Sequence, residues 1–174
     1  MPLCIVFSGL PGTGKTTVAK PLAQRVGATY LRVDSIEMAL IREGIAVEAI
    51  GGHGYAVCCA VARDNLLLGN SVVVDMVNPL AMTRRFWSEI CEQTHATLAN
   101  IELFCSDESE HKKRISDRQS DIVGHILPTW EAVVQREYEP WTTEVLQIDT
   151  AANNPNQSLE LIVDHLAMLD PHQK

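Results

Sequence analysis

The stretch that decides the fold is Ser8-Gly9-Leu10-Pro11-Gly12-Thr13-Gly14-Lys15-Thr16-Thr17. It matches the pattern G-x-x-x-x-G-K-[ST] residue for residue, and this pattern describes a glycine-rich loop between a strand and a helix. The apolar run over residues 3–7 and the helical pattern over residues 18–26 supply that strand and that helix. The stretch is therefore predicted to be a P-loop, which binds the phosphates of a nucleotide.

The residue types in the loop suit phosphate binding. Gly9, Gly12 and Gly14 permit positive φ angles and lack Cβ atoms, so backbone N–H groups can surround a phosphate. The helix that follows adds the partial positive charge of its free N–H groups. We expect Lys15 to reach the β- and γ-phosphates and the Thr16 hydroxyl to bind Mg²⁺. The alternative is a glycine-rich turn ahead of a capped helix, and the complete motif in its strand and helix context argues against it.

The composition predicts a single globular domain over residues 1–174. The 174 residues are 46% hydrophobic, which suffices for one domain with a core of its own. No apolar run is long enough to cross a bilayer. Residues 1–3 lead directly into the first strand, without the basic and apolar regions of a signal peptide. The expected location is the cytoplasm, with no membrane partner.

Net charge and cysteine usage argue against further classes of function. A net charge of −8 disfavours nucleic acid and anionic membranes, although a local basic cluster can still hold a small phosphorylated ligand. The five cysteines are Cys4, Cys58, Cys59, Cys91 and Cys105. Their odd number and the absence of C-x-x-C spacing predict reduced, buried thiols rather than a zinc or redox site.

Short β-type runs alternate with helical patterns along the chain, which predicts a parallel α/β sheet. The expected strands are 3–8, 28–33, 71–75, 100–105 and 145–149. The expected helices are 15–26, 35–43, 55–68, 79–95, 107–118, 128–138 and 158–169, with a frayed tail over 170–174. Glycines at 51, 52 and 54 predict a flexible connection.

Three of these strands have an aspartate at their carboxyl end or directly after it, namely Asp34, Asp75 and Asp149. Open α/β sheets bind ligands at the carboxyl ends of their strands, so two of these carboxylates should share a pocket with the P-loop. Asp75 is expected to hold Mg²⁺, the alternative being a cap for the next segment. Asp34 is expected to orient a substrate hydroxyl or accept its proton. Its alternative is a helix cap, but Ser35 could fill that place.

A basic cluster stands out against the acidic chain. It consists of His111, Lys112, Lys113, Arg114 and Arg118. Arg114 and Arg118 are four residues apart and would share a helix face beside the polar segment 119–127. We expect Arg118 to contact a transferring phosphoryl group, and Arg114 is a further candidate. The alternative, a solvated face paired with Glu108 and Glu110, is preferred for the two lysines.

Several weaker candidates lie elsewhere in the sequence. They are Asn78, which could reach a substrate; Arg84 and Arg85, expected at the surface; Arg136, equally suited to an ion pair; and the loop residues His53 and His125.

Together these residues resemble the small P-loop kinases, a group that includes shikimate, gluconate, chloramphenicol, polynucleotide and zeta-toxin-like kinases. The sequence is more similar still to the predicted-kinase or AAA-type ATP-binding domains allied to them. The resemblance rests on residues 9–17, Val33-Asp34-Ser35, Val73-Val74-Asp75, and the pair Arg114 and Arg118. Their order and spacing extend over nearly the whole chain.

The resemblance implies a P-loop NTPase three-layer sandwich, with a five-stranded parallel sheet in the order 2-3-1-4-5 and helices on both faces. It implies that residues 119–127 form a lid over ATP and that the loop near residues 150–152 packs on the adenine. The acceptor pocket would be built from the second helix, residues 51–54 and the loop after Asp75.

One residue departs from the pattern. Several relatives carry an arginine three residues after the strand-two aspartate, where it grips an anionic acceptor, and this chain has Glu37 there. Arg42 could substitute from farther along the helix. The departure favours a neutral or cationic hydroxyl compound as the acceptor.

The sequence thus predicts an ATP- and Mg²⁺-dependent kinase, monomeric or homodimeric, that phosphorylates a small hydroxyl-bearing acceptor. Lys15, Asp34 and Arg118 are the expected catalytic residues, and Thr16 and Asp75 the expected Mg²⁺ ligands. One alternative is a kinase for polynucleotide 5′-hydroxyls or nucleotides, which the acidic charge disfavours. Another is a regulatory ATP-binding switch that hydrolyses ATP slowly.

Overall fold

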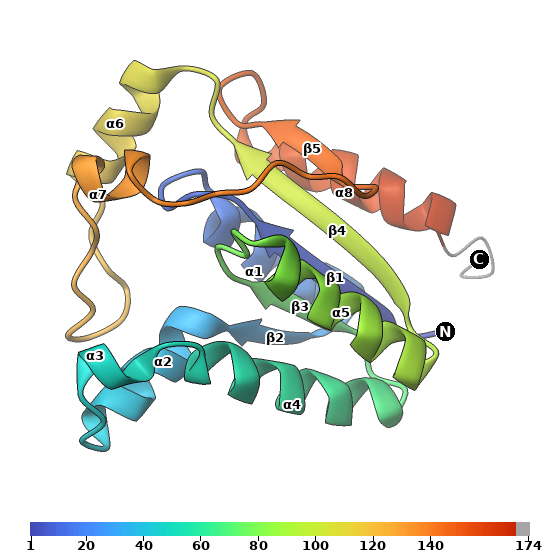
Figure 1. Ribbon diagram of the computed structural model, residues 1–174. Helices are drawn as coiled ribbons and strands as arrows, with labels where there is room; N and C mark the ends of the chain where they lie inside the picture. The colour runs from blue at the N-terminus through green and yellow to red at the C-terminus, as the bar shows by residue number, and fades with distance from the viewer. Residues whose placement is uncertain (170–174) are drawn as a thin grey trace.

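Five strands form one parallel sheet in the order β2-β3-β1-β4-β5 (Figure 1). The strands are β1 (Leu3–Ser8), β2 (Thr29–Arg32), β3 (Val72–Asp75), β4 (Thr97–Phe104) and β5 (Leu146–Asp149). The structure is a computed structural model and describes residues 1–169. The predicted order and direction of the strands are confirmed, whereas the predicted frayed tail, 170–174, lies outside the described residues.

Helices cover both faces of the sheet. They are α1 (Lys15–Val26), α2 (Val33–Arg42), α3 (Val47–Ile50), α4 (His53–Leu67), α5 (Ala81–Thr94), α6 (Glu108–Asp117), α7 (Trp130–Val134) and α8 (Pro155–Leu169). On one face α1 and α8 pack on alternate residues of the central strands, such as Ile5 and Phe7. On the other face α4 and α5 pack on the residues between them, such as Cys4 and Val6. The continuous apolar runs of β1 and β3 follow from burial on both sides.

The strand register brings three chain segments together at the carboxyl edge of the sheet. Phe7 of β1 lies beside Asp75 of β3, and Arg32 of β2 lies on the other side of Asp75. The loop that follows β1 therefore starts next to Asp75. This edge is where open parallel sheets place their ligands.

The second helix begins earlier than predicted. β2 ends at Arg32 and α2 starts at Val33, so Asp34 lies in the first helical turn rather than at a strand end. Arg32 has the extended backbone of an N-cap, with φ −125° and ψ 119°. Ser35 is already helical and cannot be the cap that the sequence suggested.

Gly51, Gly52 and Gly54 were expected to lie in a connection, and this prediction is confirmed for Gly51 and Gly52 but wrong for Gly54. α3 ends at Ile50, and α4 already begins at His53. Gly54 lies inside α4. The position favours glycine because a Cβ atom there would come within 2.4 Å of Cγ of Glu37. The glycine thus lets α2 and α4 approach each other closely.

The five cysteines are free thiols, as predicted, but the predicted burial is wrong for Cys59 and Cys105, which are only partly buried. Cys4, Cys58 and Cys91 are buried, and burial raises the pKa of Cys58 to about 12. Within residues 1–169, no helix is both long enough and apolar enough to cross a membrane.

Candidate functional site

The P-loop adopts the backbone that its glycines permit. Gly9, Gly12 and Gly14 have φ angles of 131°, 82° and 90°, and Gly14 is the N-cap of α1. The loop begins with a hydrogen bond from the Gly9 N–H to the Val77 carbonyl, 3.0 Å long. The loop therefore leads directly into the N-terminus of a twelve-residue helix, the arrangement that binds phosphates.

Helix α6 packs against the P-loop. His111 is buried, and its Nε2 atom lies 2.8 Å from the Pro11 carbonyl oxygen. The Trp130 ring packs edge-on against the imidazole. A Cβ atom on Gly12 would come within 2.6 Å of Cδ1 of Ile115. The sequence pattern placed His111 in the basic cluster and gave no signal for this packing role.

Lys15 is buried beneath the loop. Its ammonium donates a 2.8 Å hydrogen bond to the Leu10 carbonyl, and its residue exposure is 8%. Burial lowers the pKa of Lys15 to about 8, although the nearby carboxylates of Asp75 and Asp34 oppose that shift. The side chain therefore remains mostly protonated at neutral pH and is available to an anionic phosphate.

Thr16 and Asp75 form a pair of oxygen ligands at the base of the site. The Thr16 hydroxyl donates a 2.6 Å hydrogen bond to Oδ2 of Asp75, and the Tyr30 hydroxyl donates another of 2.7 Å to the same oxygen. Oxygen ligands are what Mg²⁺ prefers, and it commonly takes one or two of them from protein beside phosphates and water. The pair therefore fits Mg²⁺. In the described chain, no group of three or more His, Cys, Asp or Glu side chains could bind a metal ion.

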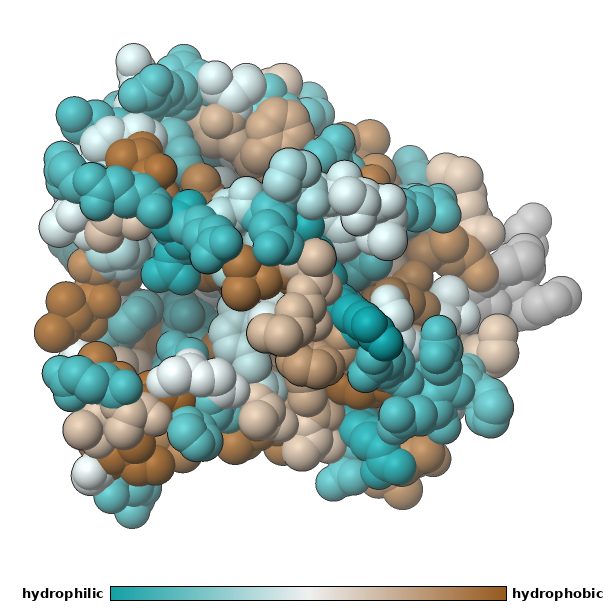
Figure 2. Space-filling model, in the orientation of Figure 1, coloured by the Kyte–Doolittle hydropathy of each residue, from teal (hydrophilic) through white to brown (hydrophobic). Residues whose placement is uncertain are grey.

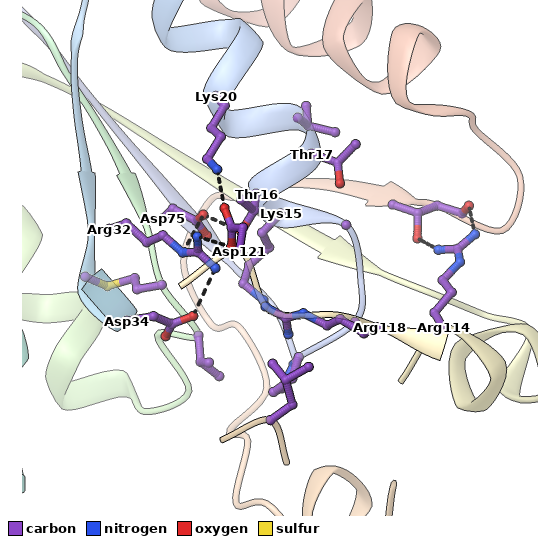
Figure 3. Close-up of a pocket in the computed structure, with 18 of the residues that line it drawn as sticks. Lys15, Thr16, Thr17, Lys20, Arg32, Asp34, Asp75, Arg114, Arg118 and Asp121 are labelled. Carbon is purple, nitrogen blue, oxygen red and sulfur yellow. Dashed lines mark hydrogen bonds and ion pairs between the residues drawn. The ribbon is translucent and has the colours of Figure 1, made fainter. Parts of the chain in front are cut away.

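Asp34 lines the same cavity as the P-loop. Its side chain is 33% exposed, and Oδ2 lies 3.6 Å from Nη2 of Arg32 (Figure 3). Asp149, the third aspartate, does not line this cavity: its carboxylate accepts hydrogen bonds from the backbone and hydroxyl of Ser106. Asp34 and Asp75 are the two that the fold brings together.

The two arginines of the basic cluster point in different directions (Figure 3). Arg118, the C-cap of α6, points into the cavity, and its charge contributes to lowering the pKa of Lys15. Arg114 instead donates to the hydroxyl and carbonyl of Thr150 at 2.9 and 3.0 Å, and to Glu110 at 3.0 Å. Arg114 thus joins α6 to the loop after β5.

Segment 119–127 is attached to the helices across the cavity. Asp121 accepts hydrogen bonds from Lys20 of α1 at 2.5 Å and from Arg32 at 2.8 Å. Arg42 donates to the Val123 carbonyl at 2.8 Å. Arg42 is thus engaged with this segment rather than being free to replace the arginine missing at residue 37.

The weaker candidates divide into structural and cavity-lining residues. Asn78 is fully buried and donates to the Ser8 hydroxyl, with φ 48°. The surface prediction for Arg84 is wrong: it is 6% exposed and stacks over Trp141. Its donors reach the carbonyls of Asn78, Pro79, Glu139 and Pro140. Arg85 is exposed and pairs with Glu89, His53 contacts the Ile50 carbonyl, and His125 and Arg136 line the cavity.

Residues of the P-loop, of α2 and of segment 119–127 line one large cavity of about 1250 Å³. In Figure 2 the surface is hollowed at the same end of the molecule, between α7 and the corner formed by α2 and α3. The P-loop and Thr150 line this cavity, and so do Asp34, Glu37 and Tyr55. The cavity is therefore shared by a phosphate-binding loop and by polar side chains of α2 and α4.

The fold and sequence match known proteins. A family model described as "AAA domain" matches residues 4–136, more than half of the chain, whereas no curated protein matches the sequence. A sugar kinase from Janibacter sp. HTCC2649 has 19% identity and a TM-score of 0.71, covering 98% of this chain and 97% of that one. A gluconokinase from Sinorhizobium meliloti 1021 has 20% identity and a TM-score of 0.67, and the match covers 97% of this chain and 93% of that one. The APS kinase of Mycobacterium tuberculosis, in complex with AMPPNP and APS, has 18% identity and a TM-score of 0.69. That match covers 95% of this chain and 97% of the other. The chain belongs to the AAA-domain family, and its fold is that of the small P-loop kinases.

Proposed function

We propose that the protein is an ATP- and Mg²⁺-dependent kinase that phosphorylates a hydroxyl group of a small molecule. One observation carries the proposal: Lys15, the pair Thr16 and Asp75, and the carboxylate of Asp34 all line one cavity. Structural neighbours that are described as sugar kinase, gluconokinase and APS kinase support it, since they share this fold.

Asp34 acts on the acceptor. The acceptor oxygen bonds to the γ-phosphorus of ATP, the bond from phosphorus to the β,γ-bridging oxygen breaks, and ADP leaves. The hydroxyl proton passes to the Asp34 carboxylate. Lys15, the loop N–H groups and Arg118 bind the oxygens of the transferring group. Mg²⁺, held by Thr16 and Asp75 with the phosphates, would neutralise part of their charge.

Segment 119–127 is the lid of this site. Its attachment to Lys20, Arg32 and Arg42 supports the assignment, because these contacts hold the segment across the cavity. A lid that excludes water protects ATP from hydrolysis, because water would otherwise take the place of the acceptor hydroxyl.

Glu37 selects a neutral or cationic acceptor. It lines the cavity half-buried, and within the described chain no group donates a hydrogen bond to its carboxylate. Burial and the neighbouring charge of Asp34 raise its pKa, while Arg136 opposes the shift. A carboxylate in this state favours hydroxyl or ammonium donors from the acceptor and repels a second anion.

Glu37→Gln is expected to raise KM for an amine-bearing acceptor about 10-fold, since a charge-assisted hydrogen bond becomes a neutral one. KM for ATP should stay within about 2-fold, because Glu37 lies outside the P-loop. Steady-state kinetics on amine-bearing and uncharged polyols measures both values. Glu43→Gln, at the exposed end of the same helix, is the matched control. An equal rise in KM in the two variants would contradict the role of Glu37.

Acceptor-stimulated ADP release tests the proposed function. A panel of sugars, amino sugars and amino alcohols is supplied with γ-labelled ATP and Mg²⁺, beside an oligonucleotide with a free 5′-hydroxyl at low salt. Label transfer to a small compound, lost in Asp34→Asn, supports the proposal. Transfer to the oligonucleotide alone would support the polynucleotide kinase. Slow hydrolysis that no compound stimulates would support the regulatory switch.

A further inference from the structure

Arg32 is a buried cation that the reaction described above does not use. Its side chain is 4% exposed, although it lines the cavity, and it is both the last residue of β2 and the N-cap of α2. An arginine keeps its charge at neutral pH, so a buried guanidinium needs carboxylates or other hydrogen-bond acceptors around it. What surrounds the guanidinium therefore indicates why it is there.

Three carboxylates surround the Arg32 guanidinium (Figure 3). Nη1 lies 2.8 Å from Oδ1 of Asp121, Nη2 lies 3.6 Å from Oδ2 of Asp34, and Nε lies 4.0 Å from Oδ2 of Asp75. Each carboxylate comes from a different element: segment 119–127, α2 and β3. One planar group thus faces the proposed base, the proposed metal ligand and the proposed lid.

The Asp121 contact is the strongest of the three. Hydrogen bonds from Lys20, and then from Arg32, hold the pKa of Asp121 well below its usual range. Lys20 is 46% exposed and Asp121 is 51% exposed, so water screens the contact between them. Arg32 is buried and belongs to β2, so its bond to Asp121 joins segment 119–127 to the sheet edge, in addition to the bond from Arg42 of α2 to Val123.

We propose that Arg32 is a positioning residue for phosphoryl transfer. It fixes Asp34 opposite the P-loop and, through Asp121, couples that placement to closure of segment 119–127. The inference rests on the proposed function, because Asp34 has a role only if an acceptor is phosphorylated. The planar guanidinium of arginine suits this role, since its five N–H donors can contact several carboxylates at once.

The experiment compares Arg32→Gln, Arg32→Lys and Asp121→Asn with Arg85→Gln. Arg85 is an exposed arginine whose partner, Glu89, lies on the same helix, so its variant controls for the loss of one charge. Hydrogen exchange over residues 119–127 reports lid attachment without any acceptor. Calorimetry with ATP and Mg²⁺ reports nucleotide binding, and acceptor-dependent ADP release gives kcat.

Arg32→Gln should lower kcat about 10- to 100-fold while changing the Kd for ATP less than about 3-fold. It should also speed exchange over residues 119–127 about 10-fold, as should Asp121→Asn, and the double variant should show no further increase. Arg32→Lys should recover part of the loss in kcat. If Arg32→Gln does not fold, Asp121→Asn and Arg32→Lys carry the same comparison, because Asp121 is half-exposed.

Unchanged exchange in folded Arg32 and Asp121 variants would overturn the coupling, as would additive effects in the double variant. An equal loss of ATP affinity and kcat in Arg32→Gln would overturn the positioning role and leave a structural one. Failure of the proposed function looks different: the unaltered protein would phosphorylate no acceptor, whatever the exchange over residues 119–127.

Discussion

Asp34→Asn is expected to lower kcat for acceptor phosphorylation about 100- to 10,000-fold, the range typical of a lost general base. The Kd for ATP should change less than about 3-fold, because Asp34 belongs to α2 and not to the P-loop. Lys15→Ala should lower kcat by a similar factor and also weaken ATP binding at least about 10-fold. Single-turnover rates and calorimetry on the two variants separate the roles.

The division of roles between Lys15 and Asp34 depends on their positions. Lys15 lies beneath the P-loop, which is proposed to surround the phosphates, so its charge should act on ATP whether or not an acceptor is present. Asp34 is one-third exposed in the cavity and bonds no part of the P-loop. Glu43→Gln again serves as the control. Equal losses of ATP affinity in the Lys15 and Asp34 variants would contradict the assignment of Asp34 to the acceptor.

The sequence predicted the sheet because its strongest signals are local. The P-loop pattern and the β-branched run that ends at Asp75 each describe one short segment. Parallel strands then bring the carboxyl ends of those segments to one edge, so Thr16 and Asp75 meet without further information. The boundary before Asp34 was predicted wrongly, because an extended Arg32 is the N-cap and not Ser35, whose side chain favours that position.

The residues that sequence reasoning missed are those whose partners lie far away in the chain. Arg32 meets Asp121 across 89 positions, and His111 meets Pro11 across 100. Tyr30 reaches Asp75 from the neighbouring strand. None of these contacts has a spacing motif, because helix and strand periodicity describe only neighbours within one element. Arg32, two residues before the predicted active-site residue Asp34, was the one available signal, since a charged strand end close to a carboxylate suggests a pair.

Arg84 is a further residue whose burial the sequence did not predict. Arg84 was expected at the surface together with Arg85, yet it is buried against backbone carbonyls from residues 78–79 and 139–140. Those carbonyls belong to two loops without regular structure. A single arginine with several donors satisfies them, which explains a buried charge that no helical pattern could predict.

Gly9→Ala is expected to destabilise the fold by about 3 kcal/mol or more, because the added Cβ atom would lie 2.1 Å from the Leu103 carbonyl oxygen. That oxygen belongs to the backbone of β4 and cannot rotate away. Gly69→Ala is the matched control: its φ of 84° is also positive, but nothing lies within 4 Å of the added atom. It should cost about 1 kcal/mol, from backbone strain alone.

Gly9→Ala should therefore lower Tm by about 6–12 °C and Gly69→Ala by about 2–4 °C, as measured by thermal unfolding. Equal shifts would mean that strain at positive φ, and not the approach of the loop to β4, explains the glycine. The Gly9 variant should also bind ATP more weakly below its Tm, since moving Gly9 away from Leu103 displaces the backbone that carries the phosphate-binding N–H groups. The contact with β4 thus makes the first glycine of the loop a requirement of the fold and of nucleotide binding together.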